Sequence, residues 1–149
     1  EGGRRAGGPA RLAAEDPRVV VSGLEVHWVA VDAMGTLFCS DDEGNAIWSM
    51  PASAMATRLR GLEAPKPLEL YSATTESSAP PRKPQGLAAD GLSVFWANGE
   101  HAEGEGDLVQ GLERPARAAR RGKAAMRLSA DAEPAYGVCL SGTHVFYTV

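Results

Sequence analysis

The sequence predicts an all-β fold made of short antiparallel strands. Three observations support this: glycine and proline are frequent, at 17 and 10 of 149 residues; short apolar runs alternate with turn residues; and one strand–turn–strand pattern occurs three times. Many turns between short strands explain the glycine and proline content. No long window carries apolar residues at the helical period.

The repeated pattern covers residues 29–41, 87–98 and 138–149. Each copy has a short apolar strand ending in Asp or Ser, a turn containing Gly, and a second strand that reaches an aromatic residue. These positions are Asp32, Gly35 and Phe38; Asp90, Gly91 and Phe95; and Ser141, Gly142 and Phe146. The aromatic positions lie 57 and then 51 residues apart. Blades of β-propellers are four-stranded antiparallel sheets of about 40–50 residues. We therefore expect a partial β-propeller of about two and a half blades.

The other strands follow from apolar runs between turn signals. Third strands are expected at 45–50 and 107–110, fourth strands at 68–71 and 125–129, and the fourth strand of a preceding, truncated blade at 18–22. The expected blades span about 24–84, 85–133 and 134–149, with 1–17 as a flexible or truncated N-terminal segment and 72–84 as a loop. The best candidate helix, 114–127, has almost no apolar face, so a solvated loop or short surface helix is expected.

Charge and cysteine content limit the function classes. The formal net charge of −4 gives no reason to expect a nucleic-acid surface over the whole chain. No apolar run approaches the roughly 20 residues of a membrane helix. Two cysteines, Cys39 and Cys139, are too few for a disulfide framework, and both lie in apolar runs where a buried free thiol is expected.

The ends of the second strands carry a family resemblance. Residues 38–41, 95–98 and 146–149 resemble the Tyr-Trp-Thr-Asp repeat of low-density-lipoprotein-receptor propellers, and residues 84–90 are similar to the strand openings of that family and of NHL-repeat propellers. The structural motif positions are Phe38, Asp41, Phe95, Trp96, Asn98, Phe146 and Tyr147. The sequence departs from the pattern at Cys39, Ala97 and Val149.

The resemblance implies a six-bladed propeller in which Asp41 and Asn98 fix turns by accepting backbone N–H bonds. Because strand side chains alternate, Phe38 and Cys39 should face opposite sides of a sheet, and adjacent Phe95 and Trp96 should supply bulk to both. Three blades cannot close a ring. The remaining blades are expected from a longer parent chain or from oligomerisation.

Candidate ligand-binding residues follow from the repeat. His27, Gln85 and Tyr136 each precede the Asp or Ser of their copy by five residues, so they should meet near the mouth of a central channel. Glu25 is a candidate metal ligand beside them. The acidic loop around His101 and the basic stretch 114–127 are expected to be solvated.

No catalytic or cofactor motif is present in the sequence. The expected function is therefore a non-catalytic scaffold that binds a protein or peptide. One alternative is a lactonase- or esterase-like propeller enzyme with a divalent cation in its channel. A further alternative is a structural repeat segment without a site of its own.

Overall fold

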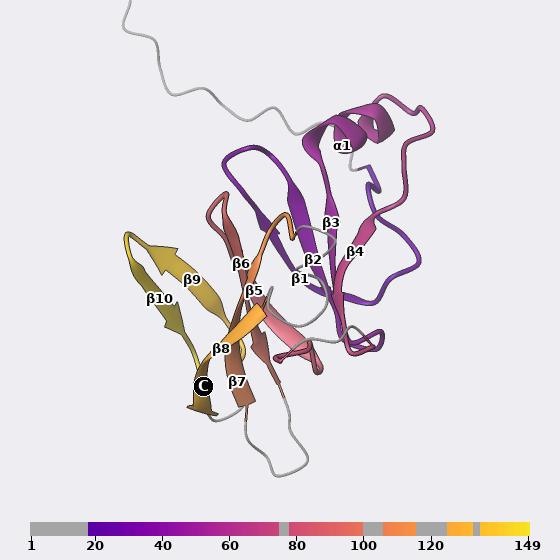
Figure 1. The fold of residues 1–149 in the computed structure, drawn as a ribbon. Helices are drawn as coiled ribbons and strands as arrows, with labels where there is room; N and C mark the ends of the chain where they lie inside the picture. The colour runs from indigo at the N-terminus through magenta and orange to yellow at the C-terminus, as the bar shows by residue number, and fades with distance from the viewer. Residues whose placement is uncertain (1–17, 75–77, 100–105, 116–124, 133–134) are drawn as a thin grey trace, which may run out of the picture.

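The computed structural model describes residues 18–74, 78–99, 106–115, 125–132 and 135–149. The predicted N-terminal segment 1–17, the loop around His101 and the basic residues 116–124 lie outside these described residues. The prediction of an all-β fold is confirmed: the described chain forms two four-stranded antiparallel sheets, one two-stranded sheet and one short helix (Figure 1). No sheet closes on itself.

The first sheet is a simple meander in the order β1-β2-β3-β4. Its strands are β1 (Val26–Val31), β2 (Leu37–Asp41), β3 (Ala46–Met50) and β4 (Leu68–Ser72). The helix α1 (Ala52–Leu59) lies in the connection between β3 and β4. It begins after Pro51 and ends before Gly61, which has a φ of +75° that suits glycine.

The second sheet repeats this meander in the order β5-β6-β7-β8. Its strands are β5 (Pro84–Ala89), β6 (Ser93–Asn98), β7 (Gly106–Leu112) and β8 (Ala125–Ala132). A hairpin of β9 (Val138–Ser141) and β10 (His144–Tyr147) follows. The three sheets stand in chain order, with β5 beside both β1 and β9 (Figure 1).

Turn chemistry explains why the strands reverse at the predicted places. In the first hairpin, Oδ1 of Asp32 accepts hydrogen bonds from the backbone N–H groups of Met34 (2.9 Å) and Thr36 (2.7 Å). In the second, Oδ1 of Asp90 accepts from the N–H groups of Leu92 (2.9 Å) and Ser93 (2.7 Å). The glycine of all three turns has a positive φ: Gly35, Gly91 and Gly142.

The sheets pack face to face through alternating side chains. Phe38 of the first sheet and Trp96 of the second belong to one apolar cluster between these sheets. Phe95 belongs to a second cluster, between the second sheet and the hairpin. Cys39 joins a third cluster on the outer face of the first sheet, with Ala54 of α1. The expected opposite orientation of Phe38 and Cys39, and of Phe95 and Trp96, is confirmed.

Two expectations are wrong, and one element was not expected. Residues 18–22 form no strand: Val20 and Val21 pack against the outer cluster of the first sheet, and Arg18 donates to the Leu59 carbonyl of α1. The helix α1 lies where no element was expected, whereas residues 125–127, at the end of the disfavoured candidate helix, lie in strand β8, where the fourth strand at 125–129 was expected. Cys39 is buried, but Cys139 is exposed, because its side chain points to the face of the hairpin that no sheet covers.

Candidate binding site

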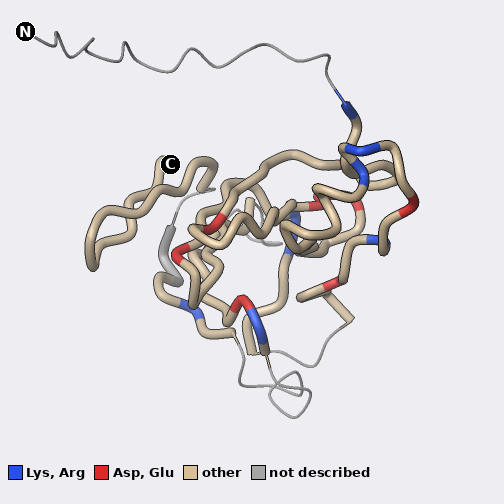
Figure 2. Tube along the Cα trace, turned by 90° about the horizontal axis from the view of Figure 1, so that it is seen from above, with Lys and Arg blue, Asp and Glu red and all other residues tan. Residues whose placement is uncertain are grey.

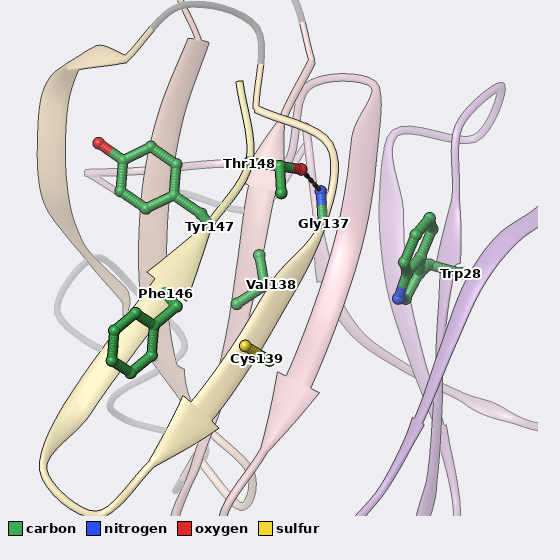
Figure 3. Close-up of a pocket in the computed structure, with 7 residues that line it drawn as sticks. All are labelled: Trp28, Gly137, Val138, Cys139, Phe146, Tyr147 and Thr148. Carbon is green, nitrogen blue, oxygen red and sulfur yellow. Dashed lines mark hydrogen bonds between the residues drawn. The ribbon is translucent and has the colours of Figure 1, made fainter.

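An apolar pocket lies between strand β1 and the terminal hairpin (Figure 3). Its volume is about 220 Å³. One lining residue comes from β1 and the others from the hairpin and its flanks: Trp28, Gly137, Val138, Cys139, Phe146, Tyr147 and Thr148. The aromatic rings are partly open to solvent, with exposed fractions of 41% for Trp28, 53% for Phe146 and 39% for Tyr147. Exposed aromatic groups around a hollow are a frequent feature of protein-binding surfaces.

A close backbone approach positions the hairpin wall of this pocket. A Cβ atom on Gly86 of β5 would collide with the carbonyl oxygen of Tyr136 and would lie 2.7 Å from the backbone nitrogen of Val138. Only glycine therefore allows β5 to lie this near to residues 136–138. The absence of this side chain sets how near the hairpin lies to the second sheet.

Hydrogen bonds extend the hairpin beyond its strands and form the base of the pocket wall. The N–H group of Gly137 donates to Oγ1 of Thr148 at 2.9 Å, and the N–H group of Thr148 donates to the Gly137 carbonyl at 3.0 Å (Figure 3). The N–H group of Tyr136 donates to the Thr148 carbonyl at 2.9 Å. These bonds continue the pairing of β9 and β10 through the residues that flank the two strands.

The residues His27, Gln85 and Tyr136, predicted from the repeat, lie next to this pocket in the chain. Trp28 and Gly137 line it, and Gly86 lies against the backbone of residues 136–138. Their side chains have separate surroundings. Gln85 donates from Nε2 to the Lys83 carbonyl at 3.4 Å, Tyr136 is 56% exposed, and His27 contacts acidic neighbours.

Those neighbours form a small acidic cluster at the start of β1. Nε2 of His27 lies 4.0 Å from Oε1 of Glu25 and 3.8 Å from Oδ2 of Asp42. The negative charge of Glu43, together with a hydrogen bond that the protonated Glu25 carboxyl group donates to it, raises the pKa of Glu25, while His27 opposes this effect. Within the described part of the chain, no group of three or more His, Cys, Asp or Glu side chains is arranged to hold a metal ion.

The motif residues at the strand ends support the framework. Oδ1 of Asp41 accepts the N–H group of Gly44 at 2.9 Å, as the resemblance implied. Asn98 makes different contacts: its Oδ1 accepts the N–H group of Arg82 at 2.8 Å, and its Nδ2 donates to Oδ1 of Asp107 at 2.6 Å. Asn98 therefore ties β6 to the segment before β5 and to β7.

The basic stretch contributes one described ion pair to this framework. Nε of Arg127 lies 2.7 Å from Oδ2 of Asp107, whose side chain is almost fully buried. Across the described residues, Lys and Arg are interspersed with Asp and Glu (Figure 2).

Most pocket residues were not identified from the sequence. Val138, Cys139 and Thr148 have no unusual local pattern, and their place in the pocket depends on the approach of the hairpin to β5. A signal was present in the repeat: a glycine follows both Gln85 and Tyr136. Paired glycines at equivalent positions of adjacent strands indicate close backbone contact.

Comparison with models of known protein families gives no match, and comparison with curated proteins gives none either. Among the described residues, no helix is long and apolar enough to cross a membrane.

Proposed function

We propose that the chain is part of a β-propeller-like scaffold that binds an extended apolar segment of a protein or peptide in the pocket between Trp28 and the terminal hairpin. The propeller interpretation has two supports: consecutive sheets share one strand order, and their first strands, β1 and β5, lie side by side with β9 next. A closed ring would need further sheets, from a longer parent chain or from other copies. The resemblance to Tyr-Trp-Thr-Asp and NHL propellers is part of this proposal.

The single observation that carries the binding proposal is the apolar lining of this pocket, to which the partly exposed residues Trp28, Phe146 and Tyr147 contribute. Trp28, Phe146 and Tyr147 present large apolar surfaces next to backbone that is already hydrogen-bonded within the hairpin. Aromatic anchors with low conformational freedom typically dominate the affinity of protein interfaces. Tyr136, also exposed, would extend the contact surface along the channel mouth.

The proposal is tested with linear peptides selected on the 149-residue chain from a displayed random library. Trp28→Ala and Phe146→Ala should each weaken binding of the selected peptides by about tenfold or more, because each removes an aromatic anchor. Leu92→Ala is the matched control, since Leu92 is 77% exposed in the turn between β5 and β6, and should leave binding unchanged.

The exposed thiol of Cys139 gives an independent readout. It lines the pocket, so a bound peptide should slow its alkylation in the unmodified chain. Burial raises the pKa of Cys39 to about 11, so Cys39 should not react in the folded protein near neutral pH. Peptides that bind the alanine variants normally and leave Cys139 reactive would place the binding surface elsewhere.

The second candidate is a lactonase- or esterase-like enzyme with a divalent cation. Its candidate ligand Glu25 lies 4.0 Å from His27, which lies 3.8 Å from Asp42, although these described side chains are not arranged as a metal site. In that case calcium, zinc or manganese should raise the Tm of the chain, and Glu25→Gln should remove the increase. An unchanged Tm with all three ions would leave the binding scaffold as the better interpretation.

A further inference from the structure

Two buried carboxyl groups from different sheets meet behind the hairpin turns. Asp32 follows β1 in the first sheet and Glu113 follows β7 in the second. The residues are only 6% and 5% exposed, respectively. Two ionised carboxylates in such a place would repel one another with little solvent to screen them. Their surroundings therefore determine how the pair is accommodated.

Each carboxyl group has one oxygen bonded to backbone and one oxygen without a donor. Oδ1 of Asp32 accepts the N–H groups described above, and Oε1 of Glu113 accepts the N–H group of Gly91 at 2.8 Å. Oδ2 of Asp32 and Oε2 of Glu113 are buried and receive no hydrogen bond from a described donor. Thr36, whose backbone N–H group donates to Oδ1 of Asp32, lines the same cavity as Glu113, and each of the two carboxyl groups shifts the pKa of the other through a side-chain contact. A carboxylate only accepts hydrogen bonds, so this contact requires a proton.

We propose that Asp32 and Glu113 share one proton across the interface of the first two sheets, and that this acid pair makes the interface sensitive to pH. The proton satisfies both orphan oxygens at once, and it removes the repulsion between two buried anions. This proposal is independent of peptide binding at the hairpin.

The surroundings place the proton on Glu113. Burial raises the pKa of Glu113, and the hydrogen bond and negative charge of Asp32 and the charge of Asp90 add to this, against a lowering by the Gly91 N–H group. Burial also acts to raise the pKa of Asp32, but hydrogen bonds from Thr36, Glu113 and Met34 outweigh it, and the net pKa is lowered. Asp32 is therefore the anion and Glu113 the donor.

Solvent and one cation lie near the pair. A cavity of about 370 Å³ is lined by Glu113, Arg114 and Thr36, among others. The charged groups that face Glu113 are thus Asp32 from the first sheet, Asp90 from the turn between β5 and β6, and Arg114 from its own segment. The cavity provides a route for protons to reach the pair.

The direction of the pH dependence follows from these shifts. For Glu113, whose folded pKa is raised, the stabilisation is complete below its ordinary value of 4.5 and is lost as the pH rises through the folded value. For Asp32, whose folded pKa is lowered, the stabilisation is present above its ordinary value of 3.8 and is lost as the pH falls through the folded value. The interface should be most stable in mildly acid solution and weaker towards neutral pH.

The test is the Tm of the 149-residue chain and of Glu113→Gln, measured from the ordinary Glu value of 4.5 to about pH 8. The glutamine amide keeps the shape, donates to Asp32 and does not titrate. The difference in Tm between variant and unmodified chain should grow with pH, by up to about 3–5 °C per pH unit within the titration window. Glu69→Gln, which alters an exposed carboxylate on β4, should give a profile parallel to that of the unmodified chain.

Two further measurements keep the proposal open to refutation. Infrared spectroscopy in mildly acid solution, just above the ordinary Glu value of 4.5, should show the carbonyl stretch of a protonated carboxyl group, which both Glu113→Gln and Asp32→Asn should abolish. Asp32→Asn keeps the Oδ1 acceptor but offers an amide donor to an ionised Glu113, so its stability should no longer fall towards neutral pH.

Parallel Tm profiles of Glu113→Gln and the unmodified chain would overturn the proposal, and so would the absence of the infrared signal from the unmodified chain. A third contrary result is a rise in Tm with calcium or manganese at neutral pH that Glu113→Gln removes. It would mean that the pair holds a cation instead of a proton.

Discussion

At the scale of single residues, Asn98 connects β6 to β7 and to the segment before β5. Its side chain donates to Oδ1 of the buried Asp107 and accepts from the N–H group of Arg82. An amide does both, whereas an ionised carboxylate only accepts. An aspartate would place a second buried carboxylate beside Asp107.

Asn98→Ala should lower the free energy of unfolding by about 2–3 kcal/mol, because it removes the buried hydrogen bonds to Arg82 and Asp107. Asn98→Asp should also destabilise the protein at neutral pH, and acidification should partly restore its stability as the new carboxyl group is protonated. Urea unfolding of both variants at two pH values measures this. An Asn98→Asp variant as stable as the unmodified chain would show that the amide donor is dispensable.

At the scale of elements, Gly86 determines how the hairpin packs on β5. The expected Cβ collision in Gly86→Ala is with backbone, which cannot move aside cheaply. The variant should therefore lose about 1–3 kcal/mol of stability, in the range of overpacked sites. It should also raise amide hydrogen exchange selectively in β9 and β10.

Gly137→Ala is the matched control for this prediction. A Cβ there would meet only the side chain of Thr148, at 3.2 Å, and that side chain can adjust. It should have a smaller effect. Equal effects of the two substitutions, or faster exchange throughout the second sheet, would contradict the role given to Gly86.

The elements also show what could be predicted from the sequence. The sequence predicts the positions of the first two hairpins, because Asp32 and Asp90 accept hydrogen bonds from backbone N–H groups in the turns and the following glycines adopt a positive φ. The helix α1 was missed because its eight residues are mostly small and bury only Ala54 fully, which leaves no clear apolar period. Residues 18–22 contain a strand-like apolar run. In the structure they pair with no strand and pack on the outer face of the first sheet instead.

The candidate site was less predictable than the strands. The repeat predicts the end of the first strand of each copy at which the site lies. It therefore predicts Tyr136, which precedes the pocket residue Gly137 in the chain. The walls of the pocket depend on the distance between the sheets and the hairpin. The pair of Asp32 and Glu113 joins residues that are 81 positions apart in the sequence. Neither relationship has a local pattern.

At the scale of the whole molecule, Tyr71 joins the first two sheets. Its ring lies against Gly111 of β7, its centroid is 5.1 Å from that of Trp96, and its hydroxyl group donates to the Leu112 carbonyl at 2.9 Å. The absent side chain of Gly111 provides the space for this ring. The sheets therefore interlock through an aromatic side chain and a glycine.

Tyr71→Ala should lower the free energy of unfolding by about 3–5 kcal/mol, as for other large buried aromatic residues. Tyr71→Phe should cost about 1 kcal/mol, because it loses the hydrogen bond to Leu112 and keeps the ring. Thermal unfolding followed by circular dichroism separates the two. A phenylalanine variant as unstable as the alanine variant would mean that the hydroxyl group, and not the ring, holds the sheets together.

The meander order of both sheets has a consequence for synthesis on the ribosome. Every strand pairs with a neighbour in the chain, so all hydrogen-bonded partners of the first sheet have been made once Ser72 has been translated. Gly111, however, is translated 39 residues after that point. A nascent chain therefore passes through a stage in which the first sheet is paired but Tyr71 is uncovered. During that interval, a chaperone that recognises exposed aromatic groups would be able to bind Tyr71.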